Sequence, residues 1–262
     1  SHFKKESWEF DMTAKRIISC LSNHQLTYDD NDKEYRSIFD HMIQKQTNHL
    51  LNDIKNSKDL ENKIIGCTAI ILTGLCYKIN KNYLEIGLSF LKKITVYSID
   101  NQGFTRSRNI KQLIFFLKYF VLIREWFKEA QVEVPDHIEE NIYYFGQGYA
   151  FIRQNITSDL LFNGNNNSST YDLDNYLKRL GYKFKNENKN YGGYIILKNK
   201  KICLAMDVGS SPNSKYTHDY QSGALSFEII SNGKKLITNC GYYRKNNQNL
   251  NEISKSSAAH ST

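Results

Sequence analysis

Side chains that could transfer a proton or hold a metal ion gather near the C-terminal end of the chain. They are His218, Asp219, Gln221, Asn239 and His260. Between Gln221 and Asn239 lie two apolar runs, residues 225–230 and 234–238, joined across Ser231-Asn232-Gly233. Asn-Gly between apolar runs predicts a β-hairpin, because both residues tolerate positive φ. The hairpin would place Gln221 just before its first strand and Asn239 at the end of its second, and His260 would have to return to the same place.

Two blocks in this region resemble the start of the β-sheet domain of the heparinase II/III family of polysaccharide lyases. They are Leu225-Ser226-Phe227-Glu228, which matches the pattern L-S-F-E, and the block 259–262, which matches A-H-N/S-T. The position of the family's catalytic histidine falls on Asp219, and His218 is one residue away. The resemblance therefore implies that His218 and Asp219 take part in catalysis.

The same resemblance predicts whether the protein binds a metal ion. Zinc-bearing family members use a His, an Asp and a second His as ligands, within the preference of zinc for N and O donors. The matching positions here hold Gln221, Asn239 and His260. Gln and Asn are neutral, weak ligands, so most of the electrostatic attraction for Zn²⁺ is gone. We predict that the protein holds no zinc and needs no other cofactor.

A helical stretch, Thr47-Asn48-His49-Leu50-Leu51-Asn52, resembles the N-H-L-L-x-N helix of the family, whose Asn or His contacts the uronic carboxylate of the substrate. Removing the C5 proton beside a carboxylate builds an enolate-like dianion that hydrogen-bond donors must neutralise. Asn48 could donate an amide N–H, and His49 could donate when charged. The alternative is an ordinary helix with His49 on its buried face.

The loop at residues 100–107 resembles the family loop D-G-G-x-F-E-R-S, which family enzymes follow with P-x-Y, and that Tyr serves as catalytic base or acid. The Tyr position falls on Ile110, which has no proton to exchange. Another phenol could take the role; the candidates are Tyr143, Tyr144, Tyr149, Tyr216 and Tyr220. Arg106 and Arg108 in and after this loop could hold acidic groups of a substrate by bidentate contacts.

The resemblance implies a lyase that cleaves uronate-containing anionic glycans by β-elimination, in the periplasm or cell envelope. Asn48, His49, His218 and Asp219 would be catalytic. The predicted substrate-binding residues are Arg106, Arg108, Tyr149 and Tyr220. The alternative is a degenerate relative that binds glycan without cleaving it, suggested by Ile110, Gln221 and Asn239 at positions that need ionisable groups.

The overall charge agrees with an anionic partner. The chain of 262 residues has a formal charge of +8 and a pI near 9.0, and a basic protein attracts acidic polysaccharide, nucleic acid or an anionic membrane surface. The alternative explanation is that the Lys-, Asn- and Ile-rich composition, and with it the positive charge, reflects codon bias. Neither an RNP-like motif nor a concentrated Lys/Arg helix supports nucleic-acid binding. We expect an acidic polysaccharide as partner, no nucleic acid and no membrane insertion, because the apolar run 64–77 is short of the ~20 residues that span a bilayer.

Hydrophobic periodicity predicts the elements that must position these residues. Apolar residues at helical spacing, with one proline in the first 155 residues, predict helices over residues 8–21, 33–54, 60–79, 83–99, 108–130, 136–154 and 172–180. The period then falls to that of strands, predicted over residues 193–197, 202–208, 225–230 and 234–238. Helix 60–79 is apolar nearly all round and should be an inner helix.

These elements predict an α+β protein with three segments. Residues 1–162 would form an antiparallel helical domain, residues 163–190 a linker with a short helix, and residues 191–262 the first strands of a truncated sheet domain. An open bundle and an α/α-toroid both fit the helices, and the family resemblance selects the toroid, followed by an antiparallel β-sandwich. The five cysteines include no C-x-x-C pair, so we expect buried free thiols.

Overall fold

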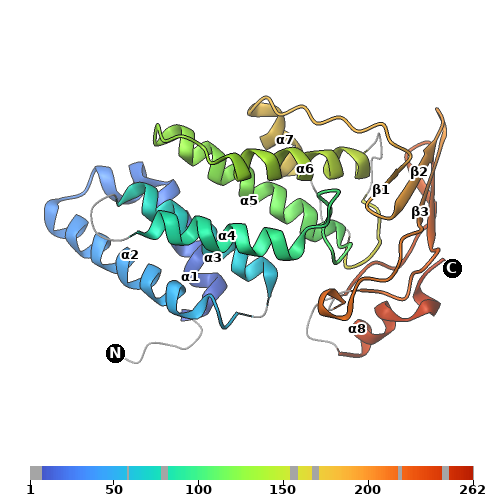
Figure 1. The fold of residues 1–262 in the computed structure, drawn as a ribbon, viewed down its shortest axis with the longest axis horizontal. Coiled ribbons are helices and arrows are strands. Elements are labelled where there is room, and N and C mark those ends of the chain that lie inside the picture. Colours follow the sequence, from blue (N-terminus) through green and yellow to red (C-terminus); the bar gives the residue numbers. More distant parts are fainter. Residues whose placement is uncertain are drawn as a thin grey trace. The chain divides into compact units, whose positions relative to one another are not determined.

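The computed structural model describes residues 8–57, 59–77, 82–153, 159–166, 171–217, 220–243 and 248–261. The chain divides into two compact units. Unit 1 comprises Ser1–Tyr97 and Tyr119–Glu139, and unit 2 comprises Ser98–Lys118 and Glu140–Thr262. The helical and sheet segments are both present (Figure 1), which confirms the predicted α+β class. The boundaries of the three predicted segments, the closed toroid and the sandwich remain predictions.

Unit 1 is helical. It contains α1 (Phe10–Ser22), a short π-helix (Gln25–Asp29), α2 (Lys33–Asp53), α3 (Leu60–Cys76), most of α4 (Tyr83–Ser98) and the C-terminal part of α5 (Ile110–Glu129). The N-terminus of α2 is capped by Asp32, whose carboxylate accepts from the Tyr35 N–H at 2.8 Å, and such a cap satisfies a donor that the helix leaves unpaired.

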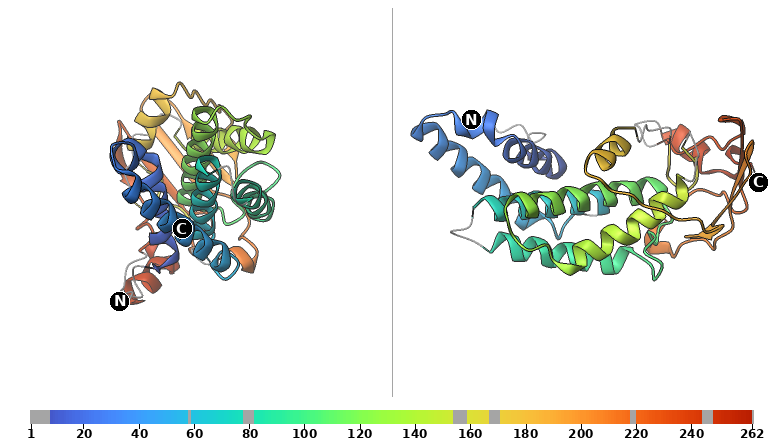
Figure 2. Two further views of the ribbon diagram at one scale, coloured as in Figure 1. Left: turned by 90° about the vertical axis from the view of Figure 1, so that its left-hand side faces the viewer. Right: turned by 90° about the horizontal axis from the view of Figure 1, so that it is seen from above.

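Helix α3 is the inner helix of unit 1, as its composition predicts. All of its residues from Ile64 to Leu75 are buried, and it packs against both α1 and α2. Figure 2 shows these three helices from two further directions. Gly66 and Gly74 permit close approach, because a Cβ at Gly66 would lie 2.4 Å from Phe10 and one at Gly74 2.4 Å from the backbone of Leu84. A helix that is apolar all round is stable in water only when neighbours cover it.

Unit 2 joins helices to a sheet. Its helices are the first part of α5, nearly all of α6 (Asp136–Ile152), α7 (Tyr171–Arg179) and α8 (Gln248–Lys255). Aromatic rings form its core: Phe116 lies 5.9 Å from Phe145, and Tyr194 lies 5.5 Å from Phe162 and 5.9 Å from Phe104, between ring centroids. These rings are buried, so the helices and the sheet of unit 2 share one hydrophobic core.

The sheet is an antiparallel meander with the order β1-β2-β3-β4-β5. Its strands are β1 (Asn190–Tyr191), β2 (Tyr194–Lys198), β3 (Ile202–Asp207), β4 (Phe227–Ser231) and β5 (Lys234–Ile237). The predicted β4–β5 hairpin is confirmed, with Asn232 at φ 47 and Gly233 at φ 78. The register shifts between Ile229 and Ile230, a bulge that bends the hairpin.

The two faces of the sheet differ. Tyr194, Ala205 and Glu228 point to a fully buried face. The alternate residues of the same strands form the other face, which is apolar and only partly covered; they are Ile195, Leu197, Ile202, Leu204, Met206, Phe227 and Ile229. Because side chains alternate along a strand, the sheet has one buried face and one partly covered apolar face.

Several predicted boundaries were wrong for identifiable reasons. The strand predicted over residues 225–230 begins at Phe227, because Leu225 has φ 63 and is 61% exposed in a turn. Helix α5 begins at Ile110 and not at residue 108, because Arg108 has φ 56, which an α-helix excludes. Helix α8 was not predicted, because it has only 8 residues and its apolar residues are just Leu250 and Ile253. Strand β1 was also missed.

The cysteines are free thiols that differ in exposure. All five cysteines are free, as predicted, but only Cys67 is buried; Cys20 and Cys203 are half-buried, and Cys76 and Cys240 are exposed. The prediction of buried thiols was therefore wrong for four of the five. Within the described residues, every helix is too short or too polar to cross a bilayer.

Candidate functional site

The loop before α5 is a rigid turn in unit 2. The Asp100 carboxylate accepts from the N–H groups of Gln102 at 2.8 Å and Phe104 at 2.9 Å, and Ile99 pairs with Thr105 as a single β-bridge. Gly103 has φ 79, and a Cβ there would lie 2.3 Å from the Cβ of Tyr144. The turn therefore needs both the Asp and the Gly that the loop 100–107 places at these positions.

Ile110 is the first residue of α5 and is only 1% exposed. It occupies the position where the family loop has its Tyr, and its side chain is part of the hydrophobic core. A buried alkyl group can neither accept nor return a proton. Any proton transfer in this protein must therefore use another residue.

Arg108, predicted to bind substrate, instead forms an ion pair and hydrogen bonds with other residues of the protein. Its guanidinium forms an ion pair with Asp207 and donates to the carbonyl oxygens of Gly193 at 2.9 Å and Ser210 at 3.0 Å. The side chain is 10% exposed, that of Asp207 1%. A Cβ at Gly193 or Gly209 would lie within 3 Å of the guanidinium, so two glycines make room for it. We no longer assign Arg108 to substrate binding, because it links the loop before α5 to the sheet.

The network around Arg108 extends through buried polar groups. Asn163 donates from Nδ2 to Asp207 Oδ2 at 2.8 Å and to the Tyr194 hydroxyl at 2.7 Å. The hydroxyl in turn donates to the Arg108 carbonyl oxygen at 2.6 Å, and the Arg108 guanidinium lies 4.9 Å from the centre of the Tyr194 ring. Burial raises the pKa of Tyr194, which keeps the phenol neutral and suited to donate. No local sequence pattern marked Asp207, because its partner Arg108 lies 99 residues away in the chain.

The three positions that align with zinc ligands in the family are also hydrogen-bonded internally. Gln221 is fully buried, accepts from the Gly164 N–H at 3.1 Å, and donates to the carbonyl oxygens of Gly241 at 3.0 Å and Ser254 at 2.7 Å. Asn239 accepts from the Ser261 N–H at 3.0 Å. His260 contacts the same Ser254 carbonyl oxygen at 3.1 Å through Nε2. As predicted, the return of the chain near residue 260 brings His260 to the same neighbourhood as Gln221.

This donor set does not fit zinc. Both amide side chains are held by backbone groups, and the set contains no anionic ligand to offset the charge of the metal. Burial lowers the pKa of His260, although its hydrogen bond to Ser254 opposes this. Within the described part of the chain, no three His, Cys, Asp or Glu side chains are grouped so that they could hold a metal ion. Gln221 therefore has a structural role, holding the loop before β4 to the segments around residues 164, 241 and 254.

Glu228, the last residue of the L-S-F-E block, is a second buried carboxylate. Its Oε1 accepts from the Asn239 N–H and the Thr238 hydroxyl, each at 3.0 Å, and Lys235 Nζ lies 3.1 Å from Oε2. The Leu161 N–H also donates to it at 3.3 Å. The residue is fully buried, and it fastens β4 to the end of β5 and to the chain at Leu161. The match of this block to the family pattern thus reflects a structural requirement.

Asn48 and His49 lie in unit 1 on α2, and their side chains have different partners. The Asn48 Oδ1 accepts from the Tyr83 hydroxyl at 3.0 Å, which directs the amide oxygen to Tyr83 and makes the Nδ2 side the donor side. His49 contacts the Trp8 carbonyl oxygen at 2.9 Å through Nε2, and its Nδ1 lies 3.4 Å from Asp53. The ring also packs edge-on to Trp8 at 5.2 Å. Both nitrogens of His49 thus have protein partners, and the Asn48 oxygen is held by Tyr83.

The remaining predicted residues lie in unit 2 or outside the described residues. Arg106 is exposed. Tyr149 is buried, and its hydroxyl donates to Asp174. Tyr220 is half-buried and accepts from the Ser211 hydroxyl at 3.3 Å. His218 and Asp219 lie outside the described residues, so their catalytic roles remain predictions.

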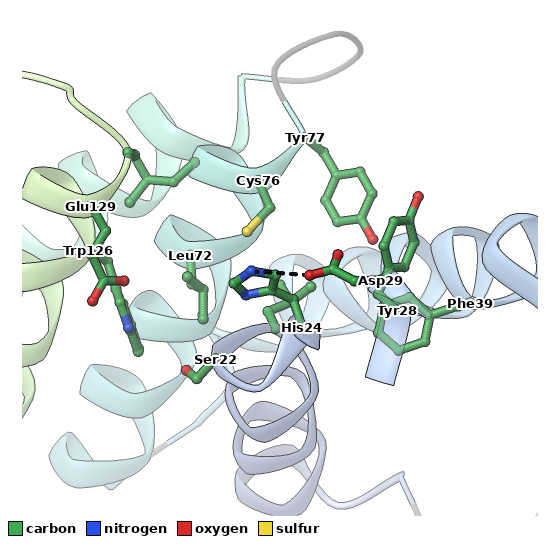
Figure 3. A pocket seen from close by; sticks show the side chains of 13 residues that line it. Ser22, His24, Tyr28, Asp29, Phe39, Leu72, Cys76, Tyr77, Trp126 and Glu129 are labelled. Atoms are coloured by element: carbon green, nitrogen blue, oxygen red, sulfur yellow. Dashed lines mark ion pairs between the residues drawn. The ribbon is translucent and has the colours of Figure 1, made fainter. Parts of the chain in front are cut away.

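Unit 1 contains a pocket of about 450 Å³ (Figure 3). Phe39, Leu72 and Trp126 contribute apolar walls, and His24 lies 3.5 Å from Asp29. In Figure 3 the sulfur of Cys76 points toward the His24 ring. Asp29 and Glu129 add negative charge to the lining, which repels an anionic ligand. This pocket does not suit an acidic glycan.

Comparison with known proteins agrees with this architecture. Residues 187–262 match the family model described as heparinase II/III-like, C-terminal. A crystal structure of heparinase III superposes with a TM-score of 0.78 at 14% identity, covering 98% of this chain and 47% of the other. Heparan sulfate lyase HepC from Pedobacter heparinus gives a TM-score of 0.73 at 12% identity, covering 100% of this chain and 46% of the other. No curated protein sequence matches the chain.

The helical region followed by an antiparallel sheet in this chain thus has the fold of the matching part of the heparinase III structures. The C-terminal part of this chain belongs to the heparinase II/III-like family. The chain spans slightly less than half of the length of the heparinase structures that it matches. The resemblance recognised from the sequence blocks is therefore confirmed for the family and the fold.

Proposed function

We propose that the protein acts on a uronate-containing acidic polysaccharide as a heparinase II/III-like lyase, by β-elimination. The family of residues 187–262 and the fold shared with a heparan sulfate lyase support the substrate class. The net charge of +8 agrees with an anionic partner. A location in the periplasm or cell envelope is part of the proposal.

The single observation that carries the proposal is the match of residues 187–262 to the heparinase II/III-like family. In the proposed reaction Asn48, whose side-chain oxygen accepts from the Tyr83 hydroxyl, would donate an amide N–H to the uronate carboxylate. In the reaction a base removes the C5 proton, the C4–O bond breaks, a C4=C5 double bond forms, and the leaving oxygen takes up a proton. Negative charge on the carboxylate grows as the proton leaves, so a fixed donor lowers the barrier. Ile110 cannot carry the proton, so a different group would have to do so.

One observation favours a second function, binding without cleavage. Ile110 is buried at the position where the family has its proton-transferring Tyr. Among the tyrosines near the loop before α5, the pKa of Tyr191 is raised to about 12, chiefly by burial and also by Asp100. A base for C5 needs the opposite shift. A protein that still bound the polysaccharide but lacked a proton-transferring group would release it unchanged.

The lyase proposal is tested by incubating the protein with heparin, heparan sulfate, alginate and chondroitin and following the ultraviolet absorbance of the unsaturated product. Asn48→Ala and the isosteric Asn48→Asp should each lower kcat by about 10²-fold or more, the loss seen when one oxyanion donor is removed. Asn56→Ala, which changes an exposed amide in the same unit, is the matched control and should be unaffected. Turnover that survives both Asn48 variants would remove the assignment.

Absence of product from every substrate, with binding retained on a glycan array, would instead support the second function. His49→Ala gives a separate readout. Because its ring contacts Trp8 and Asp53, we expect it to lower the stability of unit 1 and to change tryptophan fluorescence, whatever its effect on turnover.

A further inference from the structure

A second pocket, of about 540 Å³, lies in unit 2 between α6, α7 and the extended segment 182–187. Its volume is within the ~300–1,000 Å³ typical of ligand sites. Its inner lining includes Tyr149, Leu177, Tyr182 and Phe184. None of the lining residues belongs to a sequence block that resembles a motif of the family. We refer to this pocket as the α7 groove.

The extended segment has a regular alternation that builds the α7 groove. Tyr182, Phe184 and Asn186 are half-buried, whereas residues 183, 185 and 187 are exposed, as expected for extended chain. Phe184 packs on Gly146, where a Cβ would lie 2.1 Å from the ring. Asn186 donates to the Gln147 carbonyl oxygen at 3.1 Å. The aromatic wall is thus preformed, with Tyr182 and Phe184 5.6 Å apart between ring centroids.

The charges on the α7 groove are unbalanced. Lys178, Lys183, Lys185 and Lys198 line it and are exposed. None of these four lysines forms an ion pair with another residue of the described chain. Of its two carboxylates, Asp174 is already neutralised, because Arg153 lies 3.0 Å away and the Tyr149 hydroxyl donates to it. Glu187 alone remains to oppose four ammonium groups, so the groove attracts anions.

We propose that the α7 groove is a binding site for a sulfated or uronate-bearing saccharide. The apolar face of a sugar ring would lie against Tyr182 and Phe184, and acidic substituents would contact the lysines. An aromatic wall with a few charged groups at its edge gives affinity through the wall and orientation through the charges. The ligand class rests on the proposed function, but the groove does not include Asn48, and the residues proposed to contact the saccharide are Tyr182, Phe184 and the lysines.

The test is isothermal titration of the protein with a fully sulfated heparin hexasaccharide at low salt. Lys183→Gln combined with Lys185→Gln should weaken binding about tenfold, since each exposed charge contact changes an equilibrium constant by a few fold. Lys215→Gln combined with Lys234→Gln removes two exposed charges of the same unit outside the groove and should leave affinity within about twofold. Tyr182→Leu should weaken binding without changing its salt dependence.

The outcomes separate this proposal from the proposed function. Wild-type affinity in the Lys183/Lys185 variant, with binding lost in Asn48→Ala, would overturn the α7 groove and leave the lyase proposal standing. The reverse pattern would support the groove and count against the Asn48 site. Equal affinity for a single-stranded oligothymidylate of matched charge, with the same lysine dependence, would overturn the saccharide assignment. No binding of the hexasaccharide by the wild-type protein would overturn the α7 groove proposal, whereas the lyase proposal would still be decided by formation of the unsaturated product.

Discussion

The substitution Asp207→Asn tests the claim that a buried ion pair holds the sheet to the loop before α5. The Asp207 carboxylate accepts from the Arg108 guanidinium, from Asn163 Nδ2 at 2.8 Å and from the Gly209 N–H at 3.2 Å. An Asn side chain has one oxygen and one NH₂ group. Its NH₂ would therefore face a donor from either Asn163 or Arg108, and the guanidinium would lose its counter-charge.

The magnitude follows from the burial of both partners. Asp207 is 1% exposed and the Arg108 side chain 10%, so solvent screens the pair little. Removing one member of such a pair costs about 3–5 kcal/mol, because a buried charge remains without compensation. Replacing both, with Arg108→Met and Asp207→Leu together, should cost less than the sum of the two single changes, because no charge is left buried.

The choice of probe matters because the chain has two compact units. Its two tryptophans, Trp8 and Trp126, both lie in unit 1, whereas Asp207 lies in unit 2. Urea unfolding should therefore be followed by tryptophan fluorescence for unit 1 and by tyrosine near-ultraviolet circular dichroism, which reports mainly on unit 2 because 12 of the 18 tyrosines lie there. We expect Asp207→Asn to move the tyrosine transition to lower urea, and any shift of the tryptophan transition would report coupling between the units.

A matched control is the ion pair of Arg124 with Glu139 in unit 1, whose Nε–Oε1 distance is 2.7 Å and whose Glu side chain is 44% exposed. Glu139→Gln should cost less than about 1 kcal/mol, as exposed pairs do. If Asp207→Asn cost no more than Glu139→Gln, the buried network would not stabilise unit 2 as argued.

Protein purified from zinc-containing buffer should carry no stoichiometric zinc. Elemental analysis showing one tightly held zinc per chain would contradict the conclusion that Gln221 and Asn239 do not bind zinc. The Tyr191 pKa of about 12 lies above the ordinary value near ~10, so the unfolded chain ionises first. Stability from Tyr191 is complete below pH ~10 and is lost as pH rises toward 12; Tyr191→Phe should flatten alkaline denaturation in that window, and an unchanged slope would contradict it. Gly103→Ala should destabilise unit 2 by more than ~1 kcal/mol, because Gly103 has φ 79 and an added Cβ would meet Tyr144. A melting temperature equal to that of the wild-type protein would refute this.

Local patterns predicted the elements well. The 3.6-residue period located α1 to α7, and Asn232-Gly233 located the hairpin, because each of these signals acts over a few residues of chain. The predicted ends of helices and strands were less accurate where the backbone conformation of a single residue determines where the element begins. Arg108 and Leu225 both have positive φ, which neither residue type favours, and tertiary contacts impose it.

The candidate site was predictable only in part. The sequence blocks correctly identified the family, and Asn48 lies on the predicted helix with its amide oriented by Tyr83. The assignment of Arg108 failed because its partner Asp207 is 99 residues away and no local pattern marks the pair. The α7 groove was also missed, because its aromatic wall depends on Phe184 meeting Gly146.

The amino-acid sequence by itself determined the succession of helices and strands, the basic charge and the loss of ionisable groups at residues 110, 221 and 239, since these depend on residue type and on neighbours in the chain. Only the tertiary structure decided which charged and polar side chains bind inward and which face solvent. Arg108 and Arg106 are two residues apart, yet one is buried against Asp207 and the other is exposed. The reason is physical: a buried charge is stable only beside a partner, and the fold alone brings that partner into place.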